Sequence, residues 1–129
     1  MIASQLADWL EENNIGVVGT TIFIGELPED IEDAIMLVSV PSNQPDKYTG
    51  VEYQTIDVWA RYKDHGAADA KIHQVFELLH RNAVLFLPDY QIYNIKALGR
   101  IDDLDSDVND RKLLKASFEL TYRNLDLIS

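Results

Sequence analysis

The stretch that decides the fold is VEYQTIDVWARYKDHGAADAKIHQVFELLHRN, residues 51–82. In its first part, apolar and polar side chains alternate with period 2, which is typical of a strand with one buried and one polar face. After Asp64-His65-Gly66 the apolar residues recur at helical spacing instead. The sequence therefore predicts a strand that passes directly into an amphipathic helix folded back on it. No catalytic residue pattern lies on this unit, which points toward a structural role.

Further elements are expected on both sides of this unit. Five segments carry helix or strand patterns, namely a helix at 2–13 and strands at 16–26, 34–40, 90–100 and 113–123. The strands at 16–26 and 34–40 are expected to form an antiparallel pair. Two segments are expected to be loops: residues 41–50 contain two prolines, and residues 101–110 contain five aspartates.

The expected element order is α-β-β-β-α-β-β. Runs of strands with the helices grouped apart favour an α+β fold, with one mostly antiparallel sheet and two helices packed on one face. At 129 residues, the chain is expected to form a single domain over 1–129 that is long enough to bury a self-standing core.

The second face of this sheet is expected to be polar and yet to carry exposed aromatic side chains. Exposed aromatic residues among polar groups are typical of protein interfaces. The alternative is that a loop or the C-terminal tail covers Trp59. The candidate residues for a subunit interface or a channel lining are Tyr53, Thr55, Asp57, Trp59, Arg61, Lys115 and Glu119.

Composition disfavours several classes of partner. The net charge is −11, with 22 acidic and 11 basic residues, whereas a protein that grips a nucleic-acid backbone is expected to be basic. No sequence-specific nucleic-acid partner is therefore expected. No apolar run approaches the roughly 18–20 residues of a membrane span, so no membrane partner is expected either. The absence of cysteine excludes disulfides and thiolate metal sites, and it fits a reducing compartment.

The charges are unevenly distributed along the chain. Residues 1–46 contain nine acidic residues and no Lys or Arg, whereas the region of the last strand carries Arg111, Lys112, Lys115 and Arg123. One interpretation is a solvated acidic surface. The other is that an acidic face of one subunit meets a basic edge of the next. A head-to-tail contact of this kind closes into a ring when the rotation between subunits allows it.

An acidic stretch near the C-terminus invites comparison with a calcium loop. Residues 103–107 match the first half of an EF-hand loop, but its sixth position is Val108 instead of Gly and its twelfth is Leu114 instead of Glu. A solvated acidic loop is therefore favoured over a calcium site.

The predicted second helix carries four potential metal ligands, Asp69, His73, Glu77 and His80. They lack the HExxH spacing, and the solvent side of an amphipathic helix has the same composition, so a surface role is favoured. No serine lies in a GxSxG motif, and the glycines form no phosphate-binding loop. The sequence therefore predicts a protein that is not an enzyme and has no cofactor or metal site.

The size and the order of elements resemble the tail terminator, or minor capsid, proteins of long-tailed bacteriophages. The resemblance rests on four segments: TIDVWARYKD (55–64), AADAKIHQVFELLH (67–80), IASQLADWLEEN (2–13) and KASFELTYRN (115–124). It is a likeness in the pattern of elements over most of the chain. The family has no signature catalytic residue to carry over.

The resemblance implies a homohexameric ring at the head-proximal end of the virion tail, assembled in the host cytoplasm, with the sheet toward the interior and the helices outside. Such a ring stops polymerisation of the tail tube and joins the tail to the head, so the implied partners are further copies of the chain, the tail-tube protein and the head-tail connector protein. The loops 41–50 and 101–110 are the expected contacts with these partners. Two alternatives stay open: another head-tail connector or completion protein, and a small acidic protein-binding module of the inhibitor or immunity type.

Overall fold

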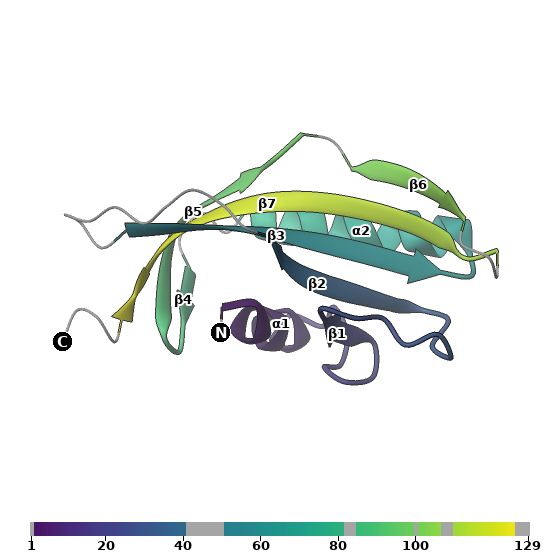
Figure 1. The fold of residues 1–129 in the computed structure, drawn as a ribbon, viewed down its shortest axis with the longest axis horizontal. Coiled ribbons are helices and arrows are strands. Elements are labelled where there is room, and N and C mark those ends of the chain that lie inside the picture. Colours follow the sequence, from purple (N-terminus) through teal and green to yellow (C-terminus); the bar gives the residue numbers. More distant parts are fainter. Residues whose placement is uncertain (1, 41–50, 82–84, 100, 107–109, 126–129) are drawn as a thin grey trace.

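The structure is a computed structural model that describes residues 2–40, 51–81, 85–99, 101–106 and 110–125. These residues form two helices and seven strands (Figure 1). The helices are α1 (Ile2–Glu12) and α2 (His65–Arg81), and the strands are β1 (Ile22–Ile24), β2 (Ala34–Val40), β3 (Val51–Tyr62), β4 (Leu85–Leu87), β5 (Tyr90–Ala97), β6 (Asp102–Ser106) and β7 (Lys112–Asn124). The loop expected at 41–50 lies outside the described residues. No helix in the described part of the chain is long and apolar enough to cross a membrane.

The predicted strand-to-helix unit is confirmed, since β3 ends at Tyr62 and α2 begins at His65. Asp64 caps the helix: its carboxylate accepts a hydrogen bond from the Gly66 amide at 2.9 Å, and its carbonyl accepts one from the Ala68 amide at 3.0 Å. These bonds satisfy amide groups that a helix N-terminus leaves without an internal partner. The apolar stripe of α2 is buried, as the helical spacing predicts.

The sheet has the strand order β1-β2-β3-β7-β5-β4, so β3 and β7 are its two middle strands. Strand β6 pairs with the beginning of β7, and β5 pairs with the remainder of β7. The fold is α+β as expected, but the sheet is mixed, because β1 runs parallel to β2 while the other pairings are antiparallel.

The expected antiparallel pairing of the first two strands is therefore wrong. Residues 25–33 do not form a tight hairpin turn; they carry the chain back so that β2 starts beside the beginning of β1, with Ile22 opposite Ile35. Gly25 leaves β1 with a φ of 79°, a conformation that glycine adopts without strain. Its amide donates a hydrogen bond to the Leu37 carbonyl at 2.8 Å, which holds the start of this return segment against β2.

The acidic stretch expected to be a loop at 101–110 contains strand β6, so this expectation is wrong for residues 102–106. Lysine side chains of β7 offset its charge. Lys112 Nζ lies 2.5 Å from the Asp103 carboxylate, and Lys115 Nζ lies 3.9 Å from that of Asp102. Aspartate is a poor strand former, and here the backbone pairing and these ion pairs with β7 compensate for its low propensity.

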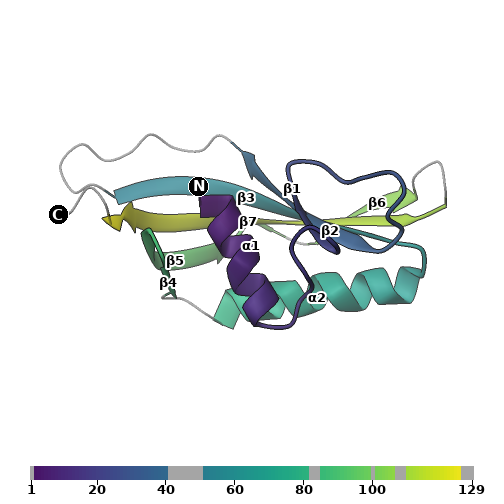
Figure 2. The ribbon, with the colours of Figure 1, turned by 90° about the horizontal axis from the view of Figure 1, so that it is seen from below.

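Helix α1 bridges the two ends of the sheet. It contacts β1 and β2 at one end and β4 at the other, which requires the sheet to curl around it (Figures 1 and 2). Gln5 fixes this position: its amide nitrogen donates to the Asp89 carboxylate at 2.7 Å, and its amide oxygen accepts from the Asp89 backbone at 3.0 Å. Buried side chains of both helices and of the sheet form one core cluster.

Two tyrosines at the margin of this core are protected from ionisation. Burial, followed by the negative charge of Asp33, raises the pKa of Tyr62 to about 12. Burial, followed by the charge of Glu52, raises the pKa of Tyr122 to about 12 as well. In both cases the neutral phenol is favoured in the folded state. The charged form would lose solvation on burial, and a nearby carboxylate would repel it.

We expect the free energy of unfolding to fall as the pH rises from the ordinary phenol pKa of 10.0 to about 12. A pKa that is raised in the folded state stabilises the fold below the unfolded value and loses this contribution as the pH passes through the folded value. The loss should be on the order of 1–2 kcal/mol for each phenol, allowing for partial solvent screening. Urea unfolding at about pH 8 and about pH 11 measures it. The double variant Tyr62→Phe/Tyr122→Phe should lose less stability over this interval, and an unchanged loss would contradict the assignment.

Candidate functional site

The candidate site is the face of the sheet turned away from the core cluster, called the second face below. In Figure 1, helix α2 passes behind β3 and β7, so it lies on the other face of these strands and leaves the second face uncovered by α2. The strand register sets four rows of side chains across this face: Met36–Trp59–Lys115, Val38–Asp57–Ser117, Val40–Thr55–Glu119 and Tyr53–Thr121. Apart from Arg61, each residue proposed from the sequence lies half-buried on this face.

Interactions within the second face hold its side chains in place. The Ser117 hydroxyl donates a hydrogen bond to the Asp57 carboxylate at 2.6 Å. Lys115 Nζ lies 5.6 Å from the centre of the Trp59 ring, a cation–π distance, and this lysine also approaches Asp102. Asp57, Ser117 and Lys115 therefore have partners inside the chain, and the Trp59 ring lies half-buried beside them. Such a surface can be covered by another protein without leaving these groups unsatisfied.

The second face extends over β5 in a way that sequence alternation did not reveal. A bulge between Ile92 and Asn94 breaks the strict period 2, so Ile92 and Ile95 are both buried. Tyr93 lies at this bulge, where its ring faces the Arg123 guanidinium at 5.8 Å. Strict alternation would place Tyr93 with Ile95 on one side of the strand, and a bulge resets that pattern.

The edge strand β4 adds an exposed aromatic residue that the sequence analysis also missed. Phe86 is 65% exposed, whereas its neighbours Leu85 and Leu87 are buried. It pairs in register with Gln91, which in turn pairs with Arg123. The alternation Leu-Phe-Leu was the available signal, but a strand of three residues is too short to be recognised from period 2.

Arg61, expected to be exposed, is only 4% exposed, and the structure corrects this point. Its guanidinium donates hydrogen bonds to the backbone carbonyls of Pro28 and Ile31. Arg111, which is 2% exposed, donates to the carbonyl of Glu29 at 2.8 Å and to that of Ile31 at 3.2 Å. These two arginines, called the arginine clamp below, tie the return segment before β2 to the sheet.

The interpretation of the last strand as a basic edge does not hold for the sheet, because β7 is a middle strand. Arg111 lies 3.2 Å from the carboxylate of Glu29 in the same chain, and Lys112 and Lys115 pair with β6. The acidic first third and the basic last strand therefore meet, in part, within one chain. The charge asymmetry of the sequence reflects internal packing at these positions.

The possible metal ligands of α2 lie on its exposed side. His73 Nδ1 lies 2.8 Å from the Asp69 carbonyl oxygen and 3.4 Å from its carboxylate, and the His80 ring stacks on Phe76 at 6.0 Å. Glu77, one helical turn beyond His73, is also exposed. Within the described ranges, no three His, Asp or Glu side chains are grouped closely enough to hold a metal ion.

Comparison with known proteins identifies the family. Residues 9–124 match the family described as "Bacteriophage tail terminator protein". A chain of the solved structure "Virion of native gene transfer agent (GTA) particle" has a similar fold, with a TM-score of 0.59 and 20% identity over 93% of this chain and 94% of that chain. No curated protein matches. Since the family match spans the end of α1, helix α2 and every strand of the structure, the chain belongs to the bacteriophage tail terminator proteins, structural components of the virion tail.

Proposed function

We propose that the chain assembles into a homohexameric ring at the head-proximal end of the tail, where it ends polymerisation of the tail tube and joins the tail to the head. Each subunit contributes one domain, with the helices outside and the sheet toward the ring interior. The proposed partners are further copies of the chain, the tail-tube protein and the head-tail connector. The observation that carries this proposal is the half-exposed second face with Trp59 and Tyr53, in a chain of the tail terminator family.

The second face has the properties of a subunit interface. A large aromatic ring anchored by neighbours is the usual centre of a strong protein contact, because it buries much apolar area at little cost in side-chain entropy. Trp59 lies in register between Met36 and Lys115, with the Asp57–Ser117 hydrogen bond in the next row. We therefore assign Tyr53, Thr55, Asp57, Trp59, Lys115 and Glu119 to the contact between subunits or to the channel lining. Arg61 is left out because it is buried against the return segment as part of the arginine clamp.

The net charge supports a role in a channel through which DNA passes. Each chain carries a formal charge of −11, so a ring of such chains has a strongly negative field. A lumen of this sign repels the phosphates of a DNA molecule in transit and does not retain it.

Deletion of the gene tests the termination step. We expect particles that lack this protein to carry tails of abnormal, extended length that fail to join heads, as seen by negative-stain electron microscopy. Tails of normal length that stay detached from heads would contradict termination and would favour another joining role.

The ring itself is tested on the purified chain. Native mass spectrometry should show a hexamer, either alone or after addition of the tail-tube protein. A chain that stays monomeric at high concentration in the presence of tail-tube protein would refute the proposed ring.

A further inference from the structure

The second face carries an apolar strip along β2, near one edge of the sheet. This strip, called the β2 strip below, consists of the half-buried side chains of Met36, Val38 and Val40. Strand β2 contains no charged residue, and Trp59 lies in register beside Met36 on the adjacent strand. The carboxylate in register with the strip, that of Asp57, is already hydrogen-bonded within the chain. Although the chain has 22 acidic residues, another protein can therefore cover the β2 strip without removing water from an unpaired carboxylate on it.

An exposed aromatic side chain lies at the opposite edge of the sheet. Strand β4 forms this edge, and its Phe86 is 65% exposed. The register places Phe86 in one row with Gln91 and Arg123, on the second face. Because α1 bridges the two ends of the sheet on the core side, the second face is convex, and both of its edges turn back from the middle strands (Figures 1 and 2). Phe86 and the β2 strip therefore lie on opposite flanks of one subunit.

We propose that the β2 strip of one subunit binds Phe86 of a second copy of the chain. This inference rests on the proposed ring, since it names the surfaces through which the subunits of that ring meet. The two surfaces differ and lie on opposite flanks, so each copy binds one neighbour on each side, and such a head-to-tail contact closes into a ring when the rotation allows it. A phenylalanine side chain buries about 150–250 Å², whereas a stable interface takes about 800 Å² from each partner. Phe86 is thus the anchor of the contact, and other residues of the two flanks supply the remaining area.

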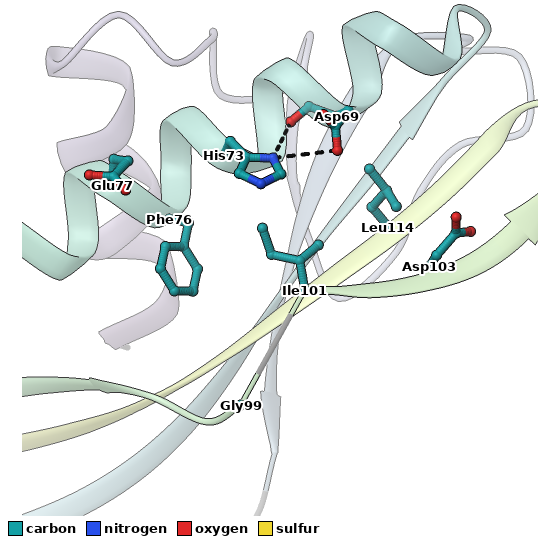
Figure 3. A pocket seen from close by; sticks show the side chains of 8 residues that line it. All are labelled: Asp69, His73, Phe76, Glu77, Gly99, Ile101, Asp103 and Leu114. Atoms are coloured by element: carbon teal, nitrogen blue, oxygen red, sulfur yellow. Dashed lines mark hydrogen bonds and ion pairs between the residues drawn. The ribbon is translucent and has the colours of Figure 1, made fainter.

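A groove on the side of the helices is a less suitable seat for Phe86. It has a volume of about 500 Å³ and lies between α2 and the strands. The apolar residues that face it are Phe76, Ile101 and Leu114 (Figure 3). Its margin carries the carboxylates of Asp69, Glu77 and Asp103. Docking there would remove water from these carboxylates and bring Asp8 and Glu12, which line a hollow together with Phe86, toward them. The β2 strip avoids this cost because β2 carries no charge.

Threonine exchanges on the two flanks test the contact, because threonine removes apolar surface and is still well tolerated in strands. We expect the association constant, measured by sedimentation velocity, to fall about 30-fold or more for Phe86→Thr and about tenfold or more for Val38→Thr/Val40→Thr. Val17→Thr is the matched control: Val17 is 52% exposed and belongs to neither surface, so association should change less than about twofold. Association of Phe86→Thr or of Val38→Thr/Val40→Thr equal to that of the control would overturn the proposal.

Mixing the two variants tests whether the two surfaces bind each other. Phe86→Thr keeps an intact β2 strip, and Val38→Thr/Val40→Thr keeps an intact Phe86, so one native contact can form between the two variants. Native mass spectrometry of the mixture should therefore show dimers with one chain of each kind in excess of the random proportion. Mixed dimers at the random proportion would mean that Phe86 and the β2 strip do not bind each other.

Failure of this inference can be told apart from failure of the proposed ring. A native chain that stays monomeric in the presence of tail-tube protein refutes both. A ring that Phe86→Thr forms as well as the native chain refutes only the contact between Phe86 and the β2 strip. If Val38→Thr/Val40→Thr associates normally but loses binding of the tail-tube protein, that protein occupies the strip instead. If the same variant lowers the free energy of unfolding and leaves association unchanged, the strip is covered within its own chain, which also overturns the proposal.

Discussion

Replacement of Arg61 by alanine is expected to lower the free energy of unfolding by about 3 kcal/mol or more. The guanidinium is buried and donates to two backbone carbonyls, those of Pro28 and Ile31. The Pro28 carbonyl loses this donor inside the protein, which costs about 1–3 kcal/mol, whereas the Ile31 carbonyl keeps a longer bond from Arg111 at 3.2 Å. The removed side chain also leaves a cavity. Removal of a buried charge recovers some solvation free energy and offsets part of this cost.

Chemical unfolding monitored by circular dichroism measures this loss. Lys96→Ala is the control, because Lys96 is exposed on β5 and its removal should change the free energy of unfolding by no more than about 0.5 kcal/mol. Arg61→Lys should be destabilising too, since an ammonium group lacks the planar fork of the guanidinium. Stability of Arg61→Ala equal to that of the control would show that the return segment does not depend on the arginine clamp.

The elements that the sequence predicts well are those whose pattern is local. Strand β3 and helix α2 each carry a clear period, and Asp64 at their junction is a recognised helix cap. The predicted placement of Asp57, Trp59 and Lys115 on one face follows from alternation in two long strands, because each residue keeps its face along the strand. The second face could therefore be proposed before its register was known.

The features that the sequence did not reveal depend on distant partners. The parallel direction of β1 is set by the return segment, which is held by Arg61 on β3 and by Arg111 just before β7. Strand β6 forms from aspartates because the lysines of β7 lie opposite them. Arg61 shows how far alternation can predict the site residues. Alternation places Arg61 on the second face, but only the position of the return segment decides that it is buried.

Replacement of Trp59 by alanine is the sharpest test of the second face. If this face joins subunits, we expect the association constant to fall by about 30-fold to 1000-fold, which corresponds to about 2–4 kcal/mol for the loss of an aromatic residue at the centre of an interface. The monomer should stay folded, because Trp59 is half-exposed and lies outside the core cluster. Sedimentation velocity over a range of concentrations measures the association, and circular dichroism checks the fold.

The second tryptophan of the chain provides a matched control. Trp9 lies on α1 and packs against the core cluster, so Trp9→Ala should lower the free energy of unfolding while leaving association of the folded subunits unchanged. If Trp59→Ala weakens association and Trp9→Ala lowers only the free energy of unfolding, an interface role of Trp59 is separated from a structural one. The comparison is fair because the same side chain is removed in both variants. If Trp59→Ala assembles as well as the native chain, the second face does not join subunits. In that case its half-exposed residues face the channel or the solvent, and the subunit contact has to be sought at the sheet edges, where Phe86 is the most exposed of the large apolar side chains in the described part of the chain.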